Sequence, residues 1–94
     1  MATIQYRGAY RFADRAALDH AVAAAFADRA LAAWRDHFEA QGSSLRILLE
    51  VPTRRSDQRT VAADVMQTLA AHAIEGIVVA RHRELAIDVF VCRA

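Results

Sequence analysis

Residues 3–12 read Thr-Ile-Gln-Tyr-Arg-Gly-Ala-Tyr-Arg-Phe, and apolar and polar side chains alternate along this segment. One side carries Ile4, Tyr6, Gly8, Tyr10 and Phe12, and the other carries Thr3, Gln5, Arg7, Ala9 and Arg11. A β-strand has a side-chain period of two, so one face can be buried while the arginine-bearing face points outward. The segment therefore predicts a sheet that helices cover on one side and leave open on the other.

Length and charge indicate a single small domain with no strong preference for polyanions. The chain has 94 residues and a formal net charge of +1, whereas general nucleic-acid binders usually carry a larger basic excess. All twelve basic residues are arginine. GC-rich, bacterial-like coding accounts for this and for the abundant alanine. The alternative is selection for planar guanidinium groups that pair with carboxylates or phosphates.

The sequence predicts a cytoplasmic protein without a membrane partner. Cys92 is the single cysteine, which excludes an internal disulfide framework. The first residues lack the apolar core of a signal peptide. No apolar run approaches the roughly 20 residues that span a bilayer.

Residues 15–40 contain strong helix formers and neither proline nor glycine. Asp14 is a suitable N-cap for this predicted helix. A continuous helix of 26 residues would extend about 39 Å, so it either overhangs the sheet or breaks near Asp28. The pentapeptide of residues 12–16 recurs as residues 26–30. Asp28 could therefore cap a second helix, although coincidence in an alanine-rich sequence is the favoured interpretation.

The second half of the chain predicts three strands and a helix. Gly42 is assigned the helix C-cap position, and a strand follows at Leu45–Val51. Ser56 is the expected N-cap of the next helix, with Asp57 in its first turn. Strands at Ile77–Ala80 and Leu85–Cys92, joined by a short polar turn, form a hairpin. In the last strand, Leu85, Ile87, Val89 and Val91 alternate with Ala86, Asp88, Phe90 and Cys92.

These elements predict an α+β two-layer sandwich in the order strand, helix, strand, helix, strand, strand. The first two strands are expected to be parallel, and both helices cover one face of a four-stranded mixed sheet. A ferredoxin-like two-layer fold is the alternative. The predicted order resembles that of Alba proteins, the C-terminal domain of translation initiation factor three and SirA-like sulfur carriers. The sulfur carriers have a Cys-Pro-x-Pro motif where this chain has residues 12–15, so their chemistry is not implied.

Two arginine clusters are candidate sites for anions or nucleic acid. Arg54, Arg55 and Ser56, with Arg59 one turn later, lie where a predicted strand leads into a helix N-terminus. Arg81 and Arg83 flank the predicted hairpin tip. The alternative for both clusters is a solvated polar loop or a charged turn that protects the sheet.

The leading functional prediction is a non-enzymatic module that forms a homodimer. No nucleophile, base and orienting group can be proposed together, and no metal or cofactor site is expected. One candidate interface is the stripe Leu31, Trp34 and Phe38, which an overhanging helix would leave uncovered. The other is the open sheet face, represented by Arg7, Arg11, Leu48 and Phe90. A nucleic-acid-binding module and a sensor of small anions are the alternatives.

Overall fold

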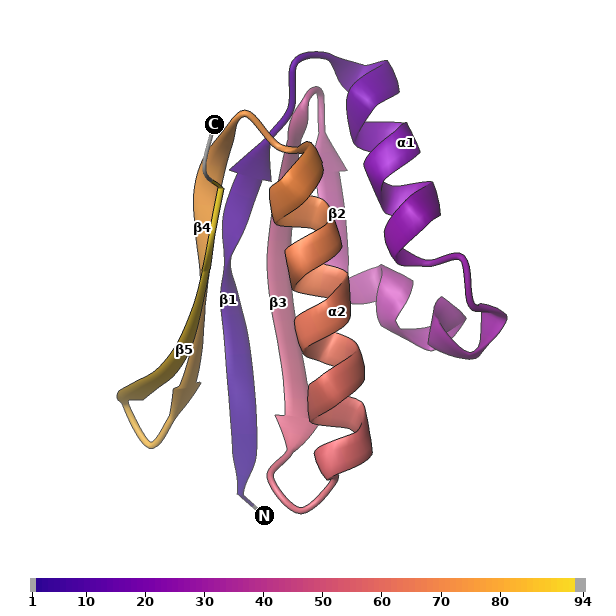
Figure 1. Ribbon diagram of the computed structural model, residues 1–94. Helices are drawn as coiled ribbons and strands as arrows, with labels where there is room; N and C mark the ends of the chain where they lie inside the picture. Colours follow the sequence, from indigo (N-terminus) through magenta and orange to yellow (C-terminus); the bar gives the residue numbers. More distant parts are fainter. Residues whose placement is uncertain (1, 93–94) are drawn as a thin grey trace.

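The computed structural model describes residues 2–92, apart from the side chains of residues 29 and 30 (Figure 1). Within this range five strands and three helical segments form an α+β fold. The strands are β1 (Thr3–Arg11), β2 (Phe38–Gln41), β3 (Ser44–Pro52), β4 (Glu75–His82) and β5 (Leu85–Val91). The helices are α1 (Arg15–Ala25), the 3-10 helix η1 (Arg29–His37) and α2 (Ser56–His72).

The strands form one antiparallel sheet in the order β2-β3-β1-β4-β5. Strand β1 is central, with Tyr6 opposite Leu49 of β3 and opposite Ala80 of β4. The predicted mixed sheet of four strands is therefore wrong in strand number and direction. The strands taken as the first and second of that sheet, β1 and β3, are antiparallel and not parallel.

The direction of β3 changes because the predicted helix of residues 15–40 ends early and an extra strand follows it. Residues Phe38–Gln41 form β2, which pairs with β3 through a two-residue turn. Gly42 has φ +60, the left-handed conformation that a glycine at the first central position of a hairpin turn adopts. Gly42 is thus a turn residue and not a helix C-cap.

The predicted long helix breaks between Phe26 and Asp28. Of the two expected alternatives, an overhanging helix or a break near Asp28, the second is present. Asp14 caps α1, and its Oδ1 accepts a 2.8 Å hydrogen bond from the main-chain N of Ala17. Asp28 directly precedes η1, and its carbonyl oxygen accepts a hydrogen bond from the N–H of Leu31. Each copy of the repeated pentapeptide therefore lies at a helix start.

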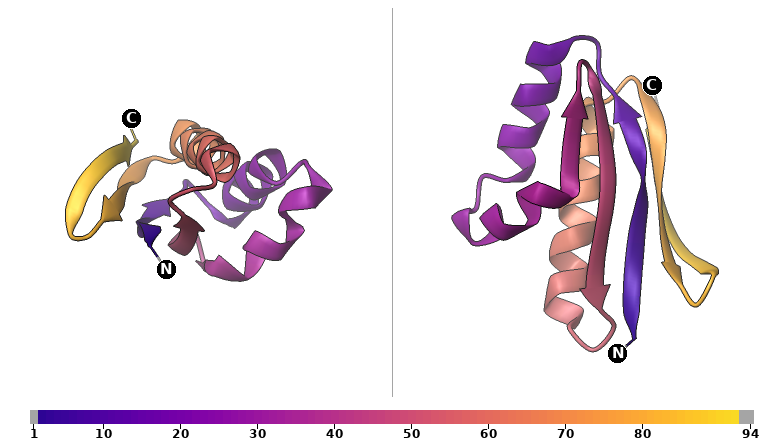
Figure 2. Two further views of the ribbon diagram at one scale, coloured as in Figure 1. Left: turned by 90° about the horizontal axis from the view of Figure 1, so that it is seen from below. Right: turned by 180° about the vertical axis from the view of Figure 1, so that it is seen from behind.

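The sequence from β1 to β4 follows the strand-helix-strand-strand-helix-strand order of ferredoxin-like folds. Two additions distinguish this chain: η1 before β2, and β5 beyond β4 at the sheet edge. Seen from below in Figure 2, α1 and α2 lie on one side of the sheet, which curves around α2. The predicted two-layer arrangement with both α-helices on one face is therefore present, whereas the predicted element order is not. The likeness in element order to Alba proteins and the other two groups no longer holds.

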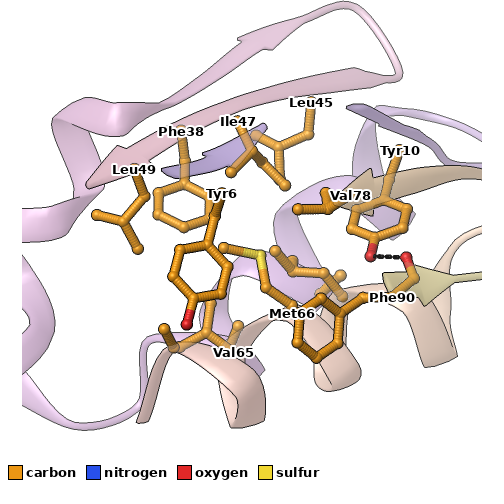
Figure 3. Packing of buried hydrophobic residues seen from close by; sticks show 14 of the residues in the cluster. Tyr6, Tyr10, Phe38, Leu45, Ile47, Leu49, Val65, Met66, Val78 and Phe90 are labelled. Atoms are coloured by element: carbon orange, nitrogen blue, oxygen red, sulfur yellow. Dashed lines mark hydrogen bonds between the residues drawn. The ribbon is translucent and has the colours of Figure 1, made fainter. Parts of the chain in front are cut away.

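The core lies between the concave face of the sheet and the helices (Figure 3). Tyr10, Phe12 and Leu18 are almost completely buried. Burial at roughly 25 cal/mol per Å² of apolar surface makes these large side chains the main stabilising contribution. The largest fully buried side chains of the core come from β1, β3, β4, α1 and α2 and from Phe12, which directly follows β1.

Two predictions about local structure need correction. In β5, Phe90 is 6% exposed and Val89 is 49% exposed, so the face assigned to the solvent is the buried one. The aromatic ring of Phe90 packs near Tyr6, with 6.2 Å between ring centroids, and buries more apolar area than a valine would. At α2, Ser56 is the first helical residue and not the N-cap; Arg55 occupies the cap position without a capping side-chain hydrogen bond.

Candidate functional site

The open face of the sheet carries a group of exposed aliphatic side chains on its central and edge strands. We call this group the open-face cluster; it consists of Leu48, Ile77, Val79, Val89 and Val91. Val79 lies opposite Val89, and Ile77 lies opposite Val91. Four of the five residues are exposed and Val79 is half-buried. An apolar group of this kind at the surface is typical of an interface.

Arg7 separates Leu48 from the rest of the open-face cluster, because it lies opposite Leu48 on β3 and opposite Val79 on β4. Its guanidinium forms no ion pair with any residue in the range 2–92. Arg11, which is also predicted for this surface, is bound to Glu75 at 2.8 Å. The hydrogen bond and charge of Arg11 hold the pKa of Glu75 below its usual value. Arg7 is therefore available to a partner, whereas Arg11 is not.

Strand β5 also presents an unpaired edge. The N–H of Cys92 donates to the carbonyl oxygen of Gly76 on β4. In an antiparallel strand, the main-chain N–H and C=O groups of successive residues point to opposite sides. Those of Val89 and Val91 therefore point away from β4. The N–H of Val89 is bound by the carboxylate of Asp88 at 2.9 Å. A charged side chain that occupies an edge donor disfavours uncontrolled strand pairing.

The predicted helical interface is covered within the chain. Phe38 is 8% exposed, and its ring lies edge-on to Phe26 with 4.9 Å between centroids. Leu31 and Trp34 are half-buried against the core. They also line a small depression of about 160 Å³ together with the first turns of α2. Because the helix breaks and η1 folds back, this stripe is not a free apolar surface.

The first arginine cluster is partly neutralised. Arg55 donates to both carboxylate oxygens of Asp57, at 3.1 and 3.0 Å, and this pairing lowers the pKa of Asp57. Arg54 is exposed in the same loop. Arg59 and Ser56 instead line a pocket beside β5. The four residues of the predicted anion site therefore do not converge on one place. The loop also follows an antiparallel strand, β3, whereas the predicted anion site assumed a parallel one.

The hairpin tip brings three arginines together on the open side. Arg7, Arg81 and Arg83 line one hollow of about 720 Å³ with Gln5 and His82. The Nε2 atom of His82 is buried and has no hydrogen-bond partner among the described residues. Figure 1 shows the hairpin tip and the start of α2 at the same end of the molecule. The two predicted arginine clusters thus share one end but use different faces.

Sequence reasoning missed most of the open-face cluster, because Val89 and Val91 were assigned to the core. Both alternating sets of side chains in β5 contain apolar residues, so the period of two could not show which set is buried. The available signal was size, since Phe90 is the largest apolar side chain of that strand and aromatic residues contribute most to cores. Phe90 is consequently removed from the candidate interface.

The described residues contain no cluster of three or more metal-ligating side chains. None of the helices in residues 2–92 combines the length and apolar character needed to cross a bilayer. Comparison of the chain with protein-family models, with curated protein sequences and with solved structures finds no match. Because a fold alone does not imply a function, the surfaces described above are the basis for assigning one.

Proposed function

We propose that this chain is a non-enzymatic interaction module that self-associates, most simply as a homodimer, through the open face of its sheet. The open-face cluster carries the proposal. A β-sheet that faces water on one side usually presents polar residues there, whereas here Ile77, Val89 and Val91 are each nearly half exposed. A second copy of the chain would remove these side chains from water.

The dimensions of the face are compatible with a modest dimer. Five strands about 4.8 Å apart and about seven residues long span roughly 19 by 23 Å, a flat area of ~440 Å². Two such faces bury about 900 Å², which is in the range of weak or transient interfaces. We therefore expect association in the micromolar range or weaker.

The charges of the face favour contact centred on β4 and β5. Val79 and Val89, with Ile77 and Val91, form an uncharged block across these two strands. Arg7 borders the block on β1. In a two-fold contact centred on the block, the two Arg7 side chains lie at opposite rims and do not face each other. The formal net charge of +1 per chain adds little long-range repulsion between copies.

Sedimentation equilibrium over a range of micromolar concentrations tests the proposal. The 10.4 kDa chain is expected to show a concentration-dependent rise toward twice its monomer mass. Val89→Lys places a charge in the centre of the uncharged block and should yield a monomer. Ala24→Lys adds the same charge at an exposed position of α1 and should leave association unchanged. A monomer at every concentration, or equal association of both variants, would contradict the proposal.

A second candidate function is binding of a nucleic acid through the hollow at the hairpin tip. The hollow gathers Arg7, Arg81 and Arg83 on one surface, and arginine is well suited to phosphate. The near-neutral net charge limits the expected affinity, because phosphate contacts dominate nucleic-acid binding.

Fluorescence anisotropy with labelled single-stranded and duplex DNA at low salt tests this second function. Three phosphate contacts predict a slope of about −2 to −3 for the logarithm of the binding constant against the logarithm of salt concentration. The double substitution Arg81→Gln/Arg83→Gln should abolish binding. Arg15→Gln/Arg35→Gln removes two exposed arginines elsewhere and serves as the charge-matched control. Equal loss of binding in both pairs, or no binding of the native chain, argues against this function.

A further inference from the structure

A pocket of about 360 Å³ lies on the helix side of the sheet, between the first turns of α2 and strands β1, β4 and β5. This volume is at the lower end of the range for small-molecule sites. The pocket is distinct from the open face and from the hollow at the hairpin tip. Its lining consists of Tyr6, Ser56, Arg59, Thr60, Ala63, Ala80, Ile87 and Asp88.

Tyr6 is the most unusual residue of this pocket. The residue as a whole is only 4% exposed, and its hydroxyl, at the accessible end of the ring, makes no hydrogen bond within residues 2–92. By contrast, the hydroxyl of Tyr10 donates to the carbonyl oxygen of Phe90. Figure 3 shows the Tyr6 hydroxyl pointing toward α2 beside Val65. Among the described residues the buried side-chain polar atom without a partner is Nε2 of His82, so the Tyr6 hydroxyl is open to the pocket that it lines, where it can bond to a ligand atom.

Two opposite charges lie close enough to Tyr6 to act on its hydroxyl. Burial raises the pKa of Tyr6, the positive charge of Arg59 opposes that rise, and the negative charge of Asp88 adds to it. Arg59 has no ion-pair partner among the described residues. Asp88 uses Oδ1 to accept from the N–H of Val89, which leaves its other oxygen for a second donor. The pocket thus offers one cationic and one anionic group that do not neutralise each other.

The remaining lining residues limit the size and polarity of a ligand. Ala63, Ala80 and Ile87 form an apolar wall, and the two alanines leave space beside it. The hydroxyl of Thr60 already donates to the carbonyl oxygen of Ser56 at 3.1 Å, so it can only accept from a ligand. A phosphate dianion would be repelled by Asp88, and a simple cation would be repelled by Arg59.

We propose that this pocket binds a small aliphatic zwitterion, with its carboxylate on Arg59 and the Tyr6 hydroxyl and its ammonium group on Asp88. A guanidinium and a phenol hydroxyl are both donors suited to a carboxylate. The carboxylate of Asp88 is an acceptor suited to an ammonium group. The short apolar body of the ligand packs against the wall formed by Ala63, Ala80 and Ile87. This site does not depend on self-association, because it lies on the helix side of the sheet.

Titration of the ¹⁵N-labelled chain, followed by amide chemical shifts, tests the site. The probes are L-valine, β-alanine and 4-aminobutyrate, which differ in the separation of the two charged groups, and isobutyrate, which has only the carboxylate. At least one zwitterion should produce saturable shifts confined to residues 56–63, 80 and 86–88. Isobutyrate should bind at least tenfold more weakly than that zwitterion.

Variants assign each role. Arg59→Gln should weaken binding of the zwitterion more than tenfold. Asp88→Asn keeps an acceptor for Val89 and should weaken zwitterion binding to the level of isobutyrate. Tyr6→Phe should cause a loss of about three- to tenfold, as expected for one hydrogen bond. Arg54→Gln removes an arginine of the neighbouring loop that does not line the pocket, and it should have no effect.

Amide spectra of each variant establish that it is folded before binding is compared. The proposal is overturned if no zwitterion gives saturable shifts, if the shifts lie elsewhere, or if they persist in Arg59→Gln. It is also overturned if isobutyrate binds as tightly as the best zwitterion, because Asp88 would then have no role. None of these outcomes affects the sedimentation test of self-association, so the two proposals fail separately.

Discussion

The hydroxyl of Tyr10 donates a hydrogen bond to the main-chain carbonyl oxygen of Phe90, and this bond joins β1 to the edge strand β5 across β4 (Figure 3). Both residues are buried. The bond gives the buried hydroxyl of Tyr10 a partner. It also holds Phe90 on the concave face of the sheet, which leaves Val89 and Val91 on the open face. The surface used in the proposed dimer therefore depends on a contact within the core.

Tyr10→Phe is expected to destabilise the fold by about 0.5 to 1.5 kcal/mol, because one buried hydrogen bond is lost. Urea denaturation of native and variant chains measures the change. Tyr6→Phe is the matched control: its hydroxyl has no partner among the described residues, so the expected change is within about 0.5 kcal/mol. Similar losses in the two variants would show that the Tyr10 hydrogen bond is not the cause.

Stability is expected to fall at alkaline pH because of the two tyrosines, which are the only ones in the chain. Burial raises the pKa of both Tyr6 and Tyr10 in the folded state, whereas an unfolded tyrosine ionises near pH ~10. The unfolded state therefore loses protons first as the pH rises. The stabilisation is fully present below that pH and is lost progressively above it.

Denaturation midpoints measured across the alkaline range, together with tyrosinate absorbance of the folded chain, check this pH dependence. The folded chain should ionise at higher pH than the chain in denaturant. Tyr10→Phe should reduce the steepness of the alkaline loss of stability. Coincident ionisation of the folded and denatured chains would contradict the expected pKa shifts.

Gly8→Ala is expected to prevent normal folding. A Cβ atom at this position would lie 2.0 Å from the carbonyl oxygen of Ile77 and 2.8 Å from the Cα of Val78. Both are main-chain atoms of β4, so neither can move without displacing the strand. Circular dichroism and amide spectra should show loss of the native structure.

Gly42→Ala is the control for this glycine series. A Cβ atom at Gly42 meets no atom within 4 Å, so its cost is only the left-handed backbone, about 1 to 2 kcal/mol. The variant should fold with a lower denaturation midpoint. If Gly8→Ala is no more destabilising than Gly42→Ala, the close approach of β1 and β4 is not the constraint.

Glu84→Gly is expected to stabilise the chain by about 0.5 to 1 kcal/mol, since it relieves a non-glycine residue in a left-handed conformation. Arg83 and Glu84 form the turn between β4 and β5 with φ values of 51 and 70. Thermal denaturation measures the gain. Glu84→Ala keeps the Cβ atom and should give no such gain, so an equal rise in both variants would assign the effect to the lost charge.

The sequence by itself determined the local features that depend on period and capping. The alternation of residues 3–12 specified both the strand and its buried side, since Ile4, Tyr6 and Tyr10 are in the core and Arg7 is exposed. The N-cap at Asp14 is also present as predicted. Both features depend only on residues close together in the chain. The alternation of side chains along a strand and the hydrogen bond of an N-cap need no partner from a distant part of the sequence.

Tertiary structure alone decided strand direction, the orientation of β5 and the grouping of site residues. Residues 38–41 have no strong strand pattern, and they become β2 only by pairing with β3. That short hairpin reverses β3 relative to β1 and removes the predicted parallel pair. Similarly, either face of β5 could have been buried, and packing of Phe90 near Tyr6 selected one. The pocket that unites Tyr6, Arg59 and Asp88 joins three elements far apart in the sequence. Such non-local contacts depend on packing that no local period encodes.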